Sequence, residues 1–118
     1  MSEIYFSHGK TPEWRYQRWD ATTTLAIWTP RTGNRLVLTN LHIANSAGVA
    51  TTFVIFLGAT NSAPARVFEF VLGASAQISP TFGQVESTAV NYILYGRPAA
   101  CPSDGIHVTA TGFEFSDA

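Results

Sequence analysis

Histidine, cysteine and carboxylate side chains are the groups in this chain that could hold a metal ion. A zinc site needs three or four such ligands close together, and many sites carry pairs of ligands at short spacings. The three histidines, His8, His42 and His107, lie far apart in the sequence, and no H-x-H, H-x3-H or C-x2-C spacing occurs. We therefore expect no metal and no other cofactor, and we interpret His42 and His107 as core or surface histidines.

Catalysis would need an activated nucleophile or a pair of facing carboxylates. Cys101 is the only cysteine, so no intrachain disulfide can form, and its neighbours Ala100 and Pro102 offer nothing to activate the thiol. A glycosidase needs two carboxylates across a cleft. After residue 35 only Glu69 and Glu114 fall within predicted strands, and nothing in the sequence places them together. We therefore expect that the protein is not an enzyme.

The segment Glu13–Asp20 is the one cluster whose composition indicates binding. Trp, Tyr and Arg dominate binding hot spots because they bury much area and keep a polar group. In a strand, alternate residues share a face, so Trp14, Tyr16 and Arg18 would lie on one side and Arg15, Gln17 and Trp19 on the other. We predict that this segment contacts another subunit, and the candidate interface residues are Trp14, Arg15, Tyr16, Arg18 and Trp19.

Three other interpretations of this segment stay open. It could be a strand that lies on the protein's own core, or a platform for sugar stacking in which Trp28 also takes part. It could also stack on nucleic-acid bases, although the net charge of −1 argues against a nucleic-acid binder.

The composition points to a domain that is covered by something else. Charged residues make up 13% of the chain, against about 25% in typical soluble domains, and residues 36–65 contain no Asp, Glu, Lys or Arg. This stretch is not a membrane span, because polar residues interrupt it long before about 20 apolar residues accumulate. The N-terminus also lacks a basic-then-apolar signal pattern, so we expect neither a membrane partner nor Sec export.

Alternation of apolar and polar residues predicts an all-β protein, an antiparallel β-sandwich of jelly-roll type with an extended N-terminal arm. We expect the arm at residues 1–20 and a single sandwich domain at residues 21–118. The predicted strands, separated by turn residues, are Ile4–Ser7, Trp14–Trp19, Thr22–Trp28, Arg35–Asn45, Ala50–Gly58, Arg66–Leu72, Ala76–Ser79, Ala89–Tyr95 and Ile106–Phe115.

The unit Arg35–Gly58 has apolar residues on both of its predicted faces. Strict alternation places Val37, Leu41 and Ile43 on one face and Leu36 and Leu38 on the other. A strand with one solvent-exposed face should show a clearer alternation of apolar and polar residues. We therefore expect one face to meet the second sheet and the other to meet a neighbouring subunit or the protein's own N-terminal segment.

Three parts of the chain together resemble small jelly-roll proteins of tailed bacteriophages. They are a strand after a Gly-Asn turn at residues 32–45, a second strand that ends in Leu57-Gly58, and a closing strand with the Gly112-Phe113-Glu114 element. The resemblance covers roughly residues 22–115. It implies a jelly-roll fold and a place among capsid decoration (cement) proteins, tail or fibre modules and related virion components, many of which are trimers.

We therefore expect a structural virion protein, most specifically a capsid decoration protein on the capsid surface. Its expected partners are copies of itself, with a trimer as the favoured assembly, and a major capsid or other virion protein. The alternative is a phage tail or fibre module or a carbohydrate-binding module, for which a glycan would be the ligand.

Overall fold

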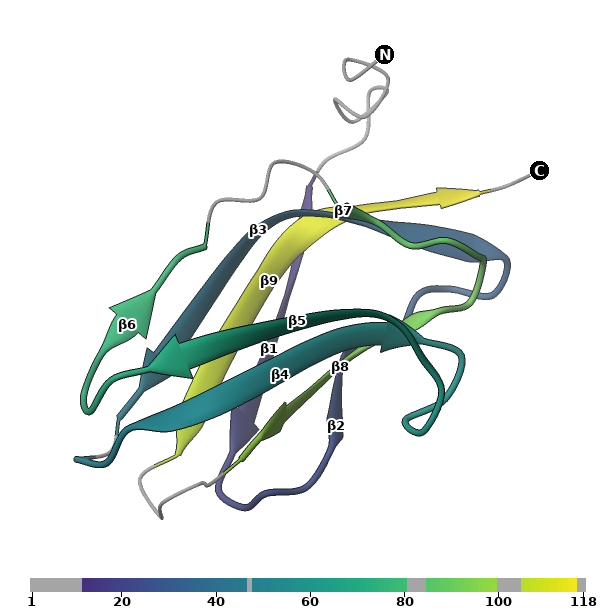
Figure 1. Ribbon diagram of the computed structural model, residues 1–118. Coiled ribbons are helices and arrows are strands. Elements are labelled where there is room, and N and C mark those ends of the chain that lie inside the picture. Colours follow the sequence, from purple (N-terminus) through teal and green to yellow (C-terminus); the bar gives the residue numbers. More distant parts are fainter. Residues whose placement is uncertain (1–11, 47, 81–84, 100–104, 117–118) are drawn as a thin grey trace.

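The computed structural model describes residues 12–46, 48–80, 85–99 and 105–116, and these form two packed antiparallel sheets (Figure 1). The predicted strand Ile4–Ser7 and the loop with Cys101 lie outside the described residues. Within the part described, the secondary structure is all β, so the predicted antiparallel β-sandwich is confirmed.

The first sheet has the order β1-β9-β3-β6, with the short β7 also paired to β3, and the second has the order β2-β8-β4-β5. The strands of the first sheet are β1 (Glu13–Trp19), β3 (Asn34–Asn45), β6 (Gln77–Ile78), β7 (Val85–Glu86) and β9 (Ile106–Ser116). The strands of the second sheet are β2 (Leu25–Trp28), β4 (Thr51–Gly58), β5 (Pro64–Leu72) and β8 (Ile93–Pro98).

The core lies between the sheets and is built from the inward side chains of both. Trp19 closes one end of it, with its ring edge-on to Phe53 at a centroid distance of 4.8 Å. Gly96 makes room for this pair, because a Cβ at this position would lie 2.8 Å from the Phe53 ring and 2.9 Å from the Trp19 ring. The residues Gly96-Arg97-Pro98, which follow the predicted strand Ala89–Tyr95, are part of β8 (Ile93–Pro98).

The position of β8 corrects the predicted strand Ala89–Tyr95, because β8 begins at Ile93. The preceding residues are held in a loop by polar contacts. The Ser87 hydroxyl accepts a hydrogen bond from the Leu36 amide, and the Asn91 carboxamide accepts one from the Gly33 amide at 2.7 Å. Asn91 also has φ of 64°, a left-handed conformation that strands exclude and Asn tolerates.

A β-bulge in β3 corrects the predicted faces of that strand. Leu38 pairs with Gly112 and Asn40 with Thr111, so Thr39 is an extra residue opposite β9. The extra residue reverses the alternation, and Leu36, Leu38, Leu41 and Ile43 therefore all belong to the core. Strict alternation predicted two apolar faces for this strand. With the bulge, most of its apolar residues lie on one face, and the alternation shifts by one residue at Thr39.

The described part of the expected arm is not an extension from the sandwich. All of β1 pairs antiparallel with β9, from Glu13 opposite Gly112 to Trp19 opposite Ile106, and β1 forms an edge of the first sheet. The domain boundary expected after residue 20 therefore falls inside the sandwich, because Trp19 is part of its core.

Candidate functional site

The two faces of β1 separate the predicted interface residues into two groups. Trp14, Tyr16 and Arg18 are exposed on the outer face of the first sheet. Arg15 and Trp19 point inward, as the alternation predicts, and the Trp19 side chain is fully buried. Trp19 is therefore a core residue, and its assignment to an intersubunit interface is wrong.

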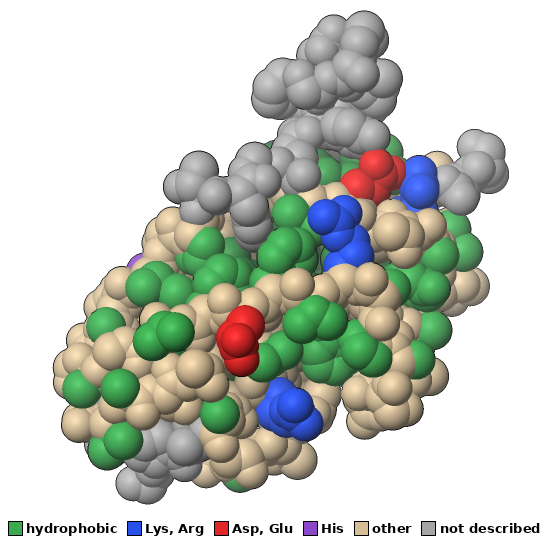
Figure 2. Space-filling view, in the orientation of Figure 1, with side chains coloured by type: hydrophobic (Ala, Val, Ile, Leu, Met, Phe, Trp, Pro, Cys, Tyr) green, Lys and Arg blue, Asp and Glu red, His purple; other side chains and the backbone are tan. Residues whose placement is uncertain are grey.

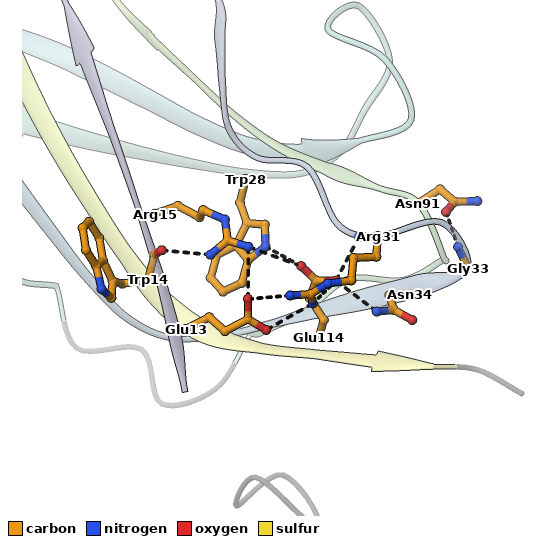
Figure 3. A network of polar contacts seen from close by, with 9 residues as sticks. All are labelled: Glu13, Trp14, Arg15, Trp28, Arg31, Gly33, Asn34, Asn91 and Glu114. Atoms are coloured by element: carbon orange, nitrogen blue, oxygen red, sulfur yellow. Dashed lines mark hydrogen bonds and ion pairs between the residues drawn. The ribbon is translucent and has the colours of Figure 1, made fainter. Parts of the chain in front are cut away.

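Arg15 belongs to a polar network between the sheets that is centred on Glu114 of β9 (Figure 3). The Glu114 side chain is 1% exposed, and it is held by three donors from residues 28–34, which span the end of β2 and the start of β3. The Trp28 indole donates to Oε2 at 2.8 Å, and the Arg31 amide and the Asn34 carboxamide donate to Oε1 at 2.9 and 3.0 Å. The carboxylate thus joins β9 to β2 and to the connection between β2 and β3.

Two guanidinium groups complete this network and balance its charge. Arg31 lies 3.1 Å from Glu114 Oε1 and 3.0 Å from Glu13 Oε1. Arg15 lies 3.0 Å from Glu13 Oε1 and 3.8 Å from Glu114 Oε2, and its guanidinium stacks over the Trp28 ring at 4.7 Å. The charges of two acids, Glu13 and Glu114, and two bases, Arg15 and Arg31, therefore cancel within one cluster. This cluster joins β1 and β9 to the connection between β2 and β3.

The pKa values of both carboxylates are lowered. Burial by itself raises the pKa of Glu114, but the hydrogen bonds from Trp28, Asn34 and the Arg31 amide, with the Arg31 charge, outweigh it. For Glu13 the hydrogen bond from Arg31 is the largest influence and lowers the pKa against a smaller opposing effect of burial. The pKa of Arg31 is raised, first by its hydrogen bond to Glu13 and then by the charge of Glu114.

This arrangement suits a contact that stabilises the fold better than it suits a general acid or base. A general acid needs a raised pKa and a general base needs access to a substrate, whereas Glu114 is buried, ionised and fully engaged by donors. Within the described residues no group of three or more His, Cys, Asp or Glu could hold a metal ion. No helix in that same part of the chain is long and apolar enough to cross a membrane.

The outer face of the first sheet carries the exposed aromatic residues of β1 beside neutral polar residues. In register, Trp14 lies opposite Thr111, Tyr16 opposite Thr109 and Arg18 opposite His107. The next strand, β3, continues these rows with Asn40, His42 and Ala44. We call these nine residues the aromatic face.

The outer face of the second sheet carries apolar side chains with a few charged ones between them (Figure 2), and the register of β4 with β5 and β8 places these side chains together. Phe56 lies between Val67 and Tyr95, and its ring stacks on Tyr95 at 5.2 Å. On β5, Val67 and Val71 are 57% and 75% exposed. We call this the valine face, and it consists of Val54, Phe56, Val67, Val71, Ile93 and Tyr95.

Charge is sparse on the valine face. The strands of the second sheet contain three charged residues, Arg66, Glu69 and Arg97. Glu69 and Arg97 flank Val54 in register, and Arg66 reaches away to the backbone of Glu86 on β7.

The Glu114 network and the valine face were not among the predicted sites. The Gly112-Phe113-Glu114 element was noticed in the sequence, and the alternation of β9 places Glu114 on the same side as the core residues Val108 and Ala110. A glutamate on the inward side of an otherwise apolar strand was therefore the available signal. Its partners, Trp28, Arg31 and Arg15, come together only through the tertiary fold.

No protein-family model and no curated protein matches the sequence. Among solved structures, the chain is similar to a protein of Bacillus endospore appendages, which are described as a novel family of disulfide-linked pili. The two share 12% sequence identity over 86% of each chain, with a TM-score of 0.41. A similarity at this level does not bear on function.

Proposed function

We propose that the protein is a structural virion component that works by association, most specifically a capsid decoration protein on the surface of a phage head. The observation that carries this proposal is the valine face. Val67 and Val71 are more than half exposed; Val67 lies opposite Phe56 and Val71 opposite Thr52, and exposed apolar side chains gathered on one face mark an interaction site more often than chance.

The strand order supports the jelly-roll architecture that the resemblance implies. The chain crosses from one sheet to the other after β1, β2, β3, β5, β7 and β8, so each sheet is assembled from distant segments. Jelly rolls are double-sheet sandwiches of this kind, and capsid proteins use them widely. Architecture alone does not establish a role, because such folds host unrelated functions.

A decoration protein needs contacts that add free energy without a single strong site. Apolar burial is worth about 25 cal/mol per Å², so each additional 400 Å² of apolar contact stabilises an assembly by roughly 10 kcal/mol before the costs of association. The scarcity of charge on the valine face lowers the desolvation cost of such contacts. Repeated around a ring or lattice, modest contacts then stabilise the whole particle by mass action.

Particle composition tests the proposal directly. Phage particles from the culture that makes this protein would be purified on a density gradient and analysed by quantitative mass spectrometry. We expect this chain at a copy number comparable to that of the major capsid protein. Its absence from the particles, or a copy number of only a few, would overturn the assignment to capsid decoration, and a few copies would favour a tail or fibre location.

A further inference from the structure

Trp14 and Tyr16 form a pair of exposed aromatic rings on the aromatic face. They are 66% and 50% exposed. Because they are two residues apart on β1, they point to the same side, and their Cα atoms are separated by about 6.5–7 Å. Figure 3 shows the Trp14 ring on the side of the strand opposite to the Arg15 guanidinium, away from the polar network. The pair is thus a surface feature that the core does not use.

Tyr16 is held in place by the neighbouring strand. Its hydroxyl is hydrogen-bonded to His107 Nδ1 on β9, and the two ring centroids lie 5.9 Å apart with an interplanar angle of 27°. A side chain that is ordered before a ligand arrives loses less conformational entropy on binding. His107 therefore has a positioning role for Tyr16.

The residues beside the two rings are neutral and polar. Thr111 and Thr109 lie opposite Trp14 and Tyr16. His42 follows in the next strand and is oriented by Ser79 at 2.8 Å and Gln77 at 3.1 Å. Asn40, in the row of Trp14, is exposed. The two threonine hydroxyls and the Asn40 carboxamide can donate and accept hydrogen bonds at the rim of a ligand stacked on the rings, whereas both ring nitrogens of His42 already have partners.

Charge excludes several other ligands for this surface. Among the nine residues of the aromatic face, Arg18 is the one with a permanent charge. A nucleic-acid strand needs a basic groove along its backbone, and a cation site needs carboxylates. The aromatic face provides neither.

We propose that the aromatic face binds a neutral oligosaccharide, with Trp14 and Tyr16 as stacking residues and Asn40, Thr109 and Thr111 as hydrogen-bonding residues. A pyranose ring has a face of C–H groups and a rim of hydroxyl groups, which matches rings beside neutral polar side chains. The valine face has apolar area, but the polar side chains that flank Val54 on it, Glu69 and Arg97, are charged. Saccharide binding and assembly therefore use opposite sheets of the sandwich.

Tryptophan fluorescence of the full chain tests this proposal, because Trp14 is the one exposed tryptophan among the three. The probes are neutral hexasaccharides of glucose, galactose, mannose and N-acetylglucosamine, with a hexamer of galacturonic acid as the charged comparison. We expect at least one neutral hexasaccharide to shift or quench the emission saturably, while the charged one does not. No saturable change with any neutral probe at millimolar concentration, or stronger binding of the acid, would overturn the proposal.

Variants assign the binding to the two rings, with calorimetry as the readout that does not need Trp14. Trp14→Ala and Tyr16→Ala should each weaken binding about tenfold or more, whereas Trp14→Phe should keep most of it. The matched control is Ser62→Ala in the exposed turn between β4 and β5, which should bind as the unmodified protein does. Retained circular dichroism in each variant separates lost binding from lost folding. Equal binding by Trp14→Ala and the control would show that the saccharide sits elsewhere and would refute the assignment.

Discussion

Glu114 shows how a single buried carboxylate can connect distant parts of a chain. It accepts from Trp28, Arg31 and Asn34, and it faces the Arg15 guanidinium. Burying a charge is costly unless every lone pair has a partner, and here donors from different segments meet that requirement. The residue therefore acts as a joint between β9, β2 and the start of β3.

Substitution of this residue should be strongly destabilising. Glu114→Gln keeps the size but places an amide NH2 against groups that are all donors, and it removes one of the two carboxylates that pair with the Arg15 and Arg31 guanidinium groups. We expect a loss of about 2–4 kcal/mol in the free energy of unfolding, measured by urea denaturation. The matched control is Glu69→Gln on exposed β5, which should change stability by less than about 0.5 kcal/mol. A Glu114→Gln protein as stable as this control would contradict the role given to the network.

Acid should weaken the fold through the same carboxylates. The folded-state pKa values of Glu114 and Glu13 are lowered, so their contribution to stability is complete above the unfolded-state pKa and is lost as pH falls through the folded-state pKa. We expect the melting temperature to fall from about pH 5 downward. The fall should be shallower in Glu114→Gln and unchanged in Glu69→Gln, and equal slopes in all three proteins would exclude this explanation.

At the scale of elements, β1 is a strand with one buried side and one exposed side. Trp19 is buried against Phe53 and Gly96, whereas Trp14 on the same strand is mostly exposed. Trp19→Ala should therefore cost about 3–5 kcal/mol of unfolding free energy, and Trp14→Ala less than about 0.5 kcal/mol. Thermal and urea unfolding of the two variants measures the difference. Comparable losses would mean that the outer face of β1 also supports the fold.

Elements with clean alternation were predictable from the sequence, and elements set by tertiary contacts were not. The inward and outward residues of β1 follow directly from period two, as does the position of β9. The bulge at Thr39 could not be predicted, because it depends on the residue across the strand pair. A Cβ at Gly112 would lie 2.0 Å from the Val37 carbonyl oxygen, so only glycine permits the close approach that accompanies the bulge. The two-residue strand β7 likewise has too little sequence to give a pattern.

The candidate sites follow the same division. The sequence singled out the aromatic residues of β1 by type and spacing, and it separated the two sides of the strand correctly. It could not tell which side was covered, so Trp19 was grouped with the exposed residues. The valine face depends on the register of β4 with β5 and with β8, which is distant in the chain, so only the fold brings all three strands together.

For the whole molecule, the valine face should control association. Replacing Val67 and Val71 together with lysine places two charges on the exposed apolar surface without touching the core. We expect the unmodified protein to self-associate, with a trimer as the favoured state, and the double variant to run as a 12.8 kDa monomer in light scattering. Thr60→Lys in the turn after β4 is the control, since it adds a charge outside this face. A monomeric unmodified protein at high concentration would count against assembly through this surface.

Because β1 pairs with β9, the first sheet can be completed only late in translation. Trp19 stands opposite Ile106, so the ribosome must make the intervening chain before the indole can be enclosed. At about 5–20 residues per second this interval is roughly 4–17 s. For that time a large hydrophobic ring and an unpaired strand edge are open to chaperones and to neighbouring nascent chains. Expression yield should therefore depend on holdase capacity and temperature more than the stability of the finished sandwich suggests.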